Sequence, residues 1–418
     1  MDLSVVIQYI NTTIGILFMV LYAYQFFYAV VPFFKKVKPL NTDIPKKRFA
    51  IITAARNEAA VIGQLMDSIA AQDYPADRFT MFVIADNCTD NTAEVARAHG
   101  AVVFERENKE LVGKGYALHT ILGQITALGG EPYDAFLVLD ADNLLAPGYL
   151  QAMNASLETH NIVTGYRNSK NYGDNWISAG YALWFLRESQ QLNRSRFLLG
   201  TSCMVSGTGF AFKRCILDKL GNGWPYHLLT EDIEFSVAQI CEGESVGYCE
   251  QAQLYDEQPV KFTQSWHQRM RWAKGYYQVI GAYGKKMLRG VFKGSFACYD
   301  ALSNLMPACI LSIVTVVTNA ITIAMMVLAR TSLVPALVSF GNMVLGSLGI
   351  FWLLGGLTMI TEWKRIRAPW HRKLWLWVTF PLYMITYLPI AIAAIFRRVE
   401  WKHIEHTRDI TLEEMQNS

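Results

Sequence analysis

Hydrophobic residues follow two different patterns along this chain. Four runs near its two ends contain no charged residue, namely 3–34, 306–329, 333–360 and 374–396. Each run exceeds the roughly 20 residues that an α-helix needs to cross a bilayer. Between them, residues 46–260 have an ordinary density of charge. The pattern predicts membrane helices at both ends of the chain and a separate folded unit in the middle.

The first apolar run is followed directly by Lys35, Lys36 and Lys38. A secretory signal peptide would instead begin with basic residues, have a shorter apolar core and end at a small-residue cleavage site. Because lysine and arginine accumulate on the cytoplasmic side of membrane helices, we expect a retained helix whose C-terminal end lies in the cytoplasm.

The last apolar run is interrupted by Pro381 and Pro389 and has basic residues on both sides. Those before it are Lys364, Arg365, Arg367, Arg372 and Lys373, and those after it are Arg397, Arg398, Lys402 and Arg408. Both sets favour the cytoplasm, and one simple crossing cannot place both there. Two alternatives stay open: a re-entrant segment broken at the prolines, or a spanning helix whose tail lies outside despite its charge.

The middle of the chain alternates between two periodicities. Short apolar runs typical of strands are separated by segments with helical spacing. We expect strands at 48–54, 79–85, 101–104 and 135–139, with helices at 58–72, 92–99 and 114–128. Strands that alternate with helices predict an α/β unit with a largely parallel sheet.

Composition narrows the class of protein. Of the 418 residues, 52% are hydrophobic and only 17% are charged, against about 25% charged in an average soluble protein. The formal net charge of +3 is too small to hold a nucleic-acid backbone unless it is clustered, so no nucleic-acid partner is expected. The seven cysteines include no C-x-x-C pair, which argues against a zinc ribbon or a disulfide framework and for reduced thiols.

Polar side chains follow three of the expected strands. They are Arg56, Asn57 and Glu58 after the first, Asp86 after the second, and Asp140 and Asp142 after the fourth. Ligands of open α/β sheets bind beyond the carboxyl ends of the strands. These polar groups therefore indicate a binding site at that edge of the sheet. The sequence has neither a P-loop nor a G-x-G-x-x-G turn after the first strand. Two carboxylates one residue apart fit a hard divalent cation that also binds substrate phosphates, as in a nucleotide diphosphate.

Two clusters further along the chain extend this pattern. Thr230, Glu231 and Asp232 precede an apolar run that begins a helix, and segment 268–272 reads Gln-Arg-Met-Arg-Trp. An arginine there can pair with diphosphate oxygens through its planar fork, and a tryptophan can stack on a sugar. The alternative for the second cluster is a juxtamembrane helix whose basic residues meet lipid headgroups.

The order D…D-x-D…T-E-D…Q-x-x-R-W resembles that of the membrane-integrated family-two glycosyltransferases. This family includes cellulose, chitin, hyaluronan and poly-N-acetylglucosamine synthases and some glycolipid glycosyltransferases. The resemblance covers about residues 48–275. It implies a GT-A fold, a Rossmann-like α/β sheet in the cytoplasm that binds a sugar nucleotide, usually a UDP-sugar, with Mg²⁺ or Mn²⁺.

The resemblance also implies roles for individual residues. Asp232 would be the general base, and Asp140 and Asp142 would bind the metal ion. The donor nucleotide would be bound by Ala54, Arg56, Glu58, Asp86, Lys114, Asp140, Gln268 and Arg271. The acceptor would be bound by Ser206, Gly207, Thr208, Glu231 and Trp272. Two positions depart from the family pattern: Ser206 stands where the family has a cysteine, and Asp86 is followed by Asn87 instead of a second aspartate.

We expect five segments along the chain. They are an N-terminal transmembrane helix (1–34), a GT-A domain (35–260), amphipathic interface helices (261–305), C-terminal transmembrane helices (306–397) and a basic tail (398–418). In the tail, residues 403–406 read His-Ile-Glu-His, which is not the H-E-x-x-H zinc motif. We interpret this stretch as solvated.

The expected function is inverting transfer from a UDP-sugar. The T-E-D and Q-x-x-R-W motifs favour a processive synthase of a β-linked extracellular polysaccharide. The alternative is transfer of a single sugar to a lipid acceptor, and a distant alternative is a non-catalytic membrane module that binds a sugar nucleotide. Three C-terminal membrane segments are few for a polymer channel in one protomer, so either a homo-oligomer or a non-translocating activity fits. The expected location is the cell membrane, multi-pass, with membrane lipids as partners and the catalytic domain in the cytoplasm.

Overall fold

A mixed eight-stranded sheet forms the centre of the computed structural model, which describes residues 3–305, 307–400, 404, 406, 408 and 410–417. The strand order is β3-β2-β1-β4-β7-β6-β8-β5. The strands are β1 (Phe49–Ala55), β2 (Phe79–Asp86), β3 (Val102–Arg106), β4 (Ala135–Asp140), β5 (Leu144–Leu145), β6 (Ile162–Ser169), β7 (Phe210–Lys213) and β8 (Val246–Asp256). β1 pairs in parallel with β2 and β4, whereas β7 is antiparallel to β4 and β6. The predicted α/β fold is confirmed, and the sheet is mixed because β7 is antiparallel to its neighbours and β5 is antiparallel to β8.

Alternating side chains of the sheet build two cores, one on each face. In β1, Phe49 and Ile51 join the core with α2 and α5, whereas Ala50 and Ile52 join the opposite core with α4, α6 and α9. Full burial of one large apolar side chain is worth about 1.5–3 kcal/mol, so both layers hold the strand ends firmly. The helices around the sheet are α2 (Ile62–Ala70), η1 (Ala76–Arg78), α3 (Thr92–Ala98), α4 (Lys114–Ala127), α5 (Tyr149–Ser156), α6 (Trp176–Arg187), η2 (Glu188–Asn193), α7 (Arg194–Leu199), α8 (Arg214–Lys219), α9 (Glu231–Cys241) and α17 (Leu412–Asn417).

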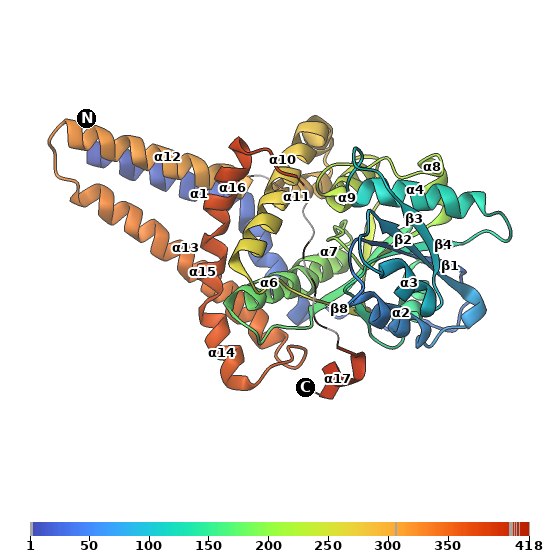
Figure 1. The fold of residues 1–418 in the computed structure, drawn as a ribbon. Helices are drawn as coiled ribbons and strands as arrows, with labels where there is room; N and C mark the ends of the chain where they lie inside the picture. The colour runs from blue at the N-terminus through green and yellow to red at the C-terminus, as the bar shows by residue number, and fades with distance from the viewer. Residues whose placement is uncertain are drawn as a thin grey trace.

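Within the part of the chain that the structure describes, four helical segments are long and apolar enough to cross a membrane: Val5–Phe34, Ile310–Leu328, Val334–Thr361 and Trp370–Phe396. They belong to α1 (Leu3–Phe34), α12 (Pro307–Leu328), α13 (Val334–Thr361), and the consecutive α14 (Trp370–Val378), α15 (Phe380–Ile385) and α16 (Tyr387–Phe396). α10 (Phe262–Phe292) and α11 (Phe296–Leu305) connect the sheet domain to them. In Figure 1, α1 and α12 run side by side away from the sheet, and α13 extends in the same direction.

Polar side chains join α1, α12 and α13 inside their apolar segments. The amide nitrogen of Asn11 donates to Oδ1 of Asn319 at 3.1 Å and to Oγ of Ser339 at 2.9 Å. Asn319 donates back to Oδ1 of Asn11 at 2.8 Å. Such interhelical hydrogen bonds contribute roughly 0.6–2 kcal/mol in a bilayer, so these three helices are held together as one group.

A buried ion pair anchors the end of α1 to the sheet domain. Arg196 of α7 donates to Asp300 of α11 through Nε at 2.8 Å and Nη2 at 2.9 Å. The hydroxyl groups of Tyr24 and Tyr28, both on α1, donate to the two oxygens of the same carboxylate at 3.0 and 2.9 Å. Three elements far apart in the sequence therefore meet at one carboxylate.

The segment α14–α16 has a different orientation from the other apolar helices. In Figure 1 it forms a column across the ends of α12 and α13 that lie nearest the sheet domain. The ring of Tyr383 lies against Gly180 of α6, and the ring of Phe380 lies against Gly355 of α13. A Cβ atom at either glycine would overlap the ring beside it. This segment therefore packs closely against both the sheet domain and α13.

Both flanks of α14–α16 contact the sheet domain. Before the segment, Arg365 pairs with Glu250 at 2.8 Å. At its start, Arg372 in the first turn of α14 donates to the carbonyl of Gly173 at 3.0 Å. After it, Ile404 and His406 line a cavity of the sheet domain. The two flanks consequently lie on the same side of the apolar helices.

Candidate active site

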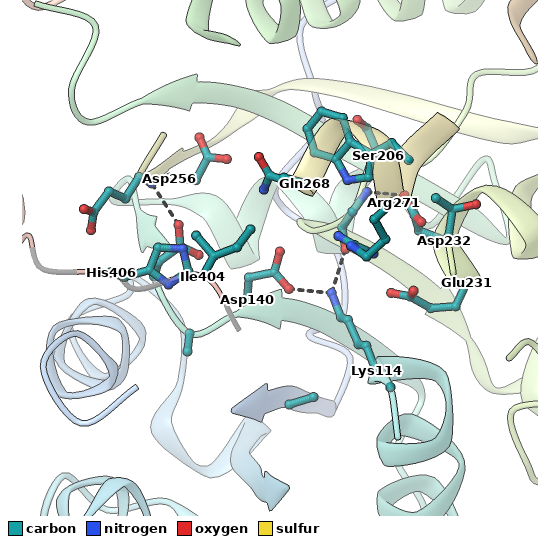
Figure 2. Close-up of a pocket in the computed structure, with 18 of the residues that line it drawn as sticks. Lys114, Asp140, Ser206, Glu231, Asp232, Asp256, Gln268, Arg271, Ile404 and His406 are labelled. Atoms are coloured by element: carbon teal, nitrogen blue, oxygen red, sulfur yellow. Dashed lines mark hydrogen bonds and ion pairs between the residues drawn. The ribbon is translucent and has the colours of Figure 1, made fainter. Parts of the chain in front are cut away.

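A cavity of about 200 Å³ lies at the carboxyl ends of β1, β2 and β4 and extends to α10. Most of the residues predicted from the sequence form its wall: Ala54, Arg56, Glu58, Asp86, Lys114, Asp140, Asp142, Ser206, Gly207, Glu231, Asp232, Gln268, Arg271 and Trp272. Figure 2 shows several of these side chains directed at one another from different elements. Thr208 lies behind the wall, where its hydroxyl accepts a hydrogen bond from the backbone of Asp140 at 2.8 Å.

The turn at Ser206 and Gly207 ties several cavity residues together. The backbone N–H of Gly207 donates to Oδ2 of Asp232 at 2.6 Å, and its carbonyl accepts from Nζ of Lys114 at 2.8 Å. Gly207 has φ of +80°, a conformation that glycine adopts without the strain of a Cβ atom. The turn therefore fixes the T-E-D aspartate and Lys114 relative to each other.

Lys114 is a buried cation that pairs with Asp140. Burial alone lowers the pKa of Lys114, but the neighbouring carboxylates of Asp140 and Glu231 raise it above its ordinary value. Lys114 therefore stays charged in this cavity and can neutralise a phosphate group.

Asp86 is held by a neighbour that the sequence pattern did not indicate. Nη1 of Arg106, at the end of β3, donates to Oδ1 of Asp86 at 2.5 Å. The side-chain amide of Asn87, a residue in the left-handed region with φ of +55°, donates to the same oxygen at 3.1 Å. The position that departs from the family pattern thus orients Asp86 within the cavity.

Carboxylates line the end of the cavity where a metal ion is expected: Glu58, Asp140, Asp142, Asp256 and Glu257. Burial, opposed by His406 and assisted by the nearby Asp142 and Asp140, raises the pKa of Glu58 to about 7. Burial likewise raises the pKa of Asp256 to about 6. Among the described residues, no group of three or more His, Cys, Asp or Glu side chains is arranged to hold a metal ion by itself. Mg²⁺ is usually bound by one or two carboxylates together with water and substrate phosphates, so Asp140 and Asp142 would be the residues that hold Mg²⁺ or Mn²⁺ here.

The C-terminal tail enters this part of the cavity, so the interpretation of a solvated stretch is wrong for Ile404 and His406. Nδ1 of His406 lies 2.9 Å from Oε2 of Glu58, and the imidazole is only 17% exposed. Burial lowers the pKa of His406, but Asp142 and Glu58 raise it to about 10. The charged imidazole therefore offsets part of the negative charge there. His403 and Glu405 lie outside the described residues.

The Q-x-x-R-W segment forms the opposite wall of the cavity, from the first half of α10. Nη1 of Arg271 donates to the carbonyl of Leu229 at 2.6 Å, which positions the guanidinium beside the T-E-D turn. Oε1 of Gln268 is buried without a hydrogen-bond partner among the described residues. An unpaired buried amide oxygen costs about 1–3 kcal/mol, so this atom is suited to a ligand that donates a hydrogen bond.

Further cavity residues come from segments to which the sequence pattern assigned no role: Arg167, Trp184, Phe185, Glu188, Asp256, Tyr276, Ile404 and His406. Arg167 of β6 pairs with Asp256 at the end of β8. The rule that ligands bind beyond strand ends also applies to β6 and β8. Assignment of those two strands from the sequence would have identified this pair.

The fold and the cavity together define a GT-A glycosyltransferase domain, because a D-x-D pair, a T-E-D helix start and a Q-x-x-R-W helix converge at the strand ends of a mixed α/β sheet. The model of the family described as "Glycosyltransferase like family 2" matches residues 45–275, and the chain belongs to this family. The fold is likewise similar to that of a mannosyltransferase from Pyrobaculum calidifontis solved with GDP-Man and Mn²⁺. The TM-score is 0.59 at 18% identity, covering 93% of this chain and 99% of the other.

Curated relatives include both a glycolipid synthase and a polysaccharide synthase. The β-monoglucosyldiacylglycerol synthase of Synechocystis sp. is 26% identical over 244 residues, which are 57% of this chain and 49% of the relative. The poly-β-1,6-N-acetyl-D-glucosamine synthase of Staphylococcus epidermidis is 25% identical over 262 residues, which are 59% of this chain and 61% of the relative. The matched part is therefore about half to three fifths of these relatives.

Proposed function

We propose that this glycosyltransferase moves one sugar from a nucleotide diphosphate-sugar, with a UDP-sugar as the leading candidate, to a lipid acceptor at the cytoplasmic surface of a membrane. The observation that carries the proposal is the aromatic connection between the cavity and α14–α16. Trp184 lines the cavity and packs on Tyr387 of α16, with ring centroids 6.1 Å apart. Tyr181 contacts Trp272 of the cavity wall at 5.7 Å and Tyr383 of α15 at 5.2 Å. An acceptor embedded in the membrane surface beside α15 and α16 would lie next to this wall.

The position of α14–α16 supports delivery of the acceptor from the membrane. A crossing would put the two flanks of this segment about 30 Å apart on opposite sides of the hydrocarbon, yet both flanks contact the sheet domain. Basic residues on both sides also favour a cytoplasmic location for both. We therefore infer that α14–α16 lies along the membrane surface, and that α1, α12 and α13 are the helices that cross.

The arrangement of those three helices favours a non-translocating activity. α1 packs against both α12 and α13, which also touch each other. We infer that this group of three mutually packed helices, as far as the structure describes them, provides no conduit for a sugar chain within one protomer. The sequence motifs favoured a polymer synthase, whereas this packing and the glycolipid-synthase relatives favour a single transfer to a lipid.

In the proposed mechanism, Asp232 accepts the proton of the acceptor hydroxyl as that oxygen attacks the anomeric carbon from the face opposite the nucleotide. The C–O bond to the diphosphate breaks in the same step, so the configuration inverts. Lys114 and Arg271 neutralise charge on the leaving diphosphate, and such preorganised electrostatics usually contributes more to catalysis than any other single effect. The hydrogen bond from the Gly207 N–H orients the Asp232 carboxylate. General-base help is worth about 10²–10⁴-fold.

The acidic end of the cavity would hold Mg²⁺ or Mn²⁺ through Asp140 and Asp142. When bound, the ion would supply further positive charge to the diphosphate. Two cations already offset part of the negative charge of these carboxylates, since Lys114 pairs with Asp140 and His406 pairs with Glu58.

A second candidate function is synthesis of a polysaccharide, which the poly-N-acetylglucosamine synthase relatives favour. In that case a conduit would have to come from several protomers, because one protomer contributes too few crossing helices. This candidate predicts a homo-oligomer as the active form.

A product analysis distinguishes the two functions. The full chain in nanodiscs that contain diacylglycerol is incubated with a panel of ¹⁴C-labelled UDP- and GDP-sugars and either Mg²⁺ or Mn²⁺. We expect one labelled product that partitions into organic solvent and whose mass corresponds to lipid plus one sugar. A labelled high-molecular-weight ladder in the aqueous phase would refute the lipid-acceptor proposal and support the polymer synthase.

A further inference from the structure

Glu188 is a carboxylate of the cavity wall that has no role in the mechanism above. It begins η2, a π-helical stretch between α6 and α7. π-helical turns contain one residue more than an α-helical turn and occur frequently at functional sites. Here Glu188 lines the cavity, whereas the preceding Arg187 is buried outside its wall.

The Ser206–Gly207 turn places Glu188 beside the proposed base. Oγ of Ser206 donates to Oε2 of Glu188 at 3.1 Å, and the N–H of the next residue, Gly207, donates to Oδ2 of Asp232 at 2.6 Å. Figure 2 shows Ser206 next to Asp232 in the cavity. Since adjacent residues hold the two carboxylates, both face the part of the cavity where an acceptor hydroxyl and the donor sugar must meet.

The surroundings of Glu188 suit a carbohydrate or glycerol hydroxyl. Trp184, Phe185 and Tyr276 line the same cavity and provide aromatic surfaces. Burial raises the pKa of Glu188 above its ordinary value, although the positive charges of Arg196 and Arg167 oppose this shift. A buried carboxyl group is costly unless hydrogen bonds satisfy it, and a substrate hydroxyl would add one to the bond from Ser206.

We propose that Glu188 binds a substrate hydroxyl beside the reacting centre, either on the acceptor or on the donor sugar. This assignment deepens the proposed function and rests on it. The carboxylate accepts a hydrogen bond from the hydroxyl and fixes the orientation of that substrate relative to Asp232. No bond to Glu188 is made or broken during transfer.

The test is Glu188→Gln in the full chain in nanodiscs, which keeps the size of the side chain and removes its charge. A hydrogen bond to a charged group is worth about 1.5–3 kcal/mol, so we expect kcat/KM to fall by about 10- to 100-fold. The matched control is Glu234→Gln on α9. Glu234 is buried and accepts from the N–H of Leu228 at 2.9 Å, but it lies outside the cavity wall, so its replacement should leave kcat/KM unchanged.

Two further assays identify the source of the hydroxyl. If the acceptor supplies it, hydrolysis of the nucleotide-sugar without acceptor stays within twofold of wild type while transfer falls. If the donor sugar supplies it, hydrolysis and transfer fall together while the affinity for the free nucleotide stays the same. The proposal is overturned if transfer is unchanged, or if free-nucleotide affinity and melting temperature fall along with it. Failure of the proposed function would instead appear in the wild-type product, which would be a polymer or absent.

Discussion

Replacement of Asp300 by asparagine tests the anchor between α1 and the sheet domain. The Asp300 carboxylate faces the Arg196 guanidinium with side-chain exposures of 2% and 0%, and it also accepts from two tyrosines of α1. Asp300→Asn leaves the arginine buried without a counter-charge and turns an N–H₂ group toward groups that donate. Loss of one partner of a buried pair costs about 3–5 kcal/mol.

The expected shift in melting temperature follows from this cost. At about 2 °C per kcal/mol for a chain of more than 200 residues, Asp300→Asn should melt about 6–10 °C below wild type. The assay is thermal unfolding in detergent with a thiol-reactive dye. We expect Cys203 and Cys298, which are buried near the anchor, to react when it opens, whereas the exposed Cys215 reacts in the folded protein and sets the baseline.

The control for this prediction is an exposed ion pair. Arg214 and Asp218 of α8 are 34% and 53% exposed, and such pairs contribute only about 0–1 kcal/mol. Asp218→Asn should therefore shift the melting temperature by no more than about 2 °C. Equal shifts for the Asp218 and Asp300 variants would show that the buried pair does not hold α1 in place.

Three further predictions concern packing, metal binding and pH. Gly180→Ala should lower the melting temperature, because the added Cβ overlaps the Tyr383 ring at a cost of about 1–3 kcal/mol. Gly123→Ala, whose Cβ meets nothing within 4 Å, should raise the melting temperature. A change of the same sign in the melting temperature of both variants would contradict close packing of α15. Asp142→Ala should abolish the effect of EDTA on binding of a fluorescent nucleotide, and persistence of that effect would remove Asp142 from the metal site. Burial raises the pKa of Glu231 from 4.5 to about 7, so this group makes wild type less stable as pH rises through that window. The melting temperature of Glu231→Gln minus that of wild type should therefore be larger at pH 8 than at pH 5. An equal difference at the two pH values would refute this prediction.

The strand ends of the first half of the sheet could be predicted from the sequence because they depend on local patterns. Apolar runs typical of strands end at Asp86 and Asp140, and the parallel pairing of β1 with β2 and β4 brings those ends to one edge. The same rule places Arg56 and Glu58 there. Local patterns and one topological rule therefore suffice for this part of the cavity.

The rest of the cavity depends on pairings between distant segments. Arg167 and Asp256 meet because β6 and β8 are neighbours in the sheet although 89 residues separate the two side chains. His406 reaches Glu58 across 348 residues. No periodicity encodes such contacts. The position of α14–α16 likewise follows from its packing on α6 and α13, whereas its length and hydropathy fit a crossing helix equally well.

The central claim is that Asp232 acts as the general base, whereas other residues of the cavity bind the nucleotide. The most direct test measures transfer and nucleotide affinity for Asp232→Asn in one preparation. We expect kcat to fall by about 10²–10⁴-fold, while the dissociation constant for the nucleotide changes by less than about threefold, because the proposed role of the Asp232 carboxylate is to accept a proton from the acceptor hydroxyl and not to bind the nucleotide. Near-full turnover by Asp232→Asn, or loss of nucleotide binding in proportion to the loss of activity, would contradict the claim.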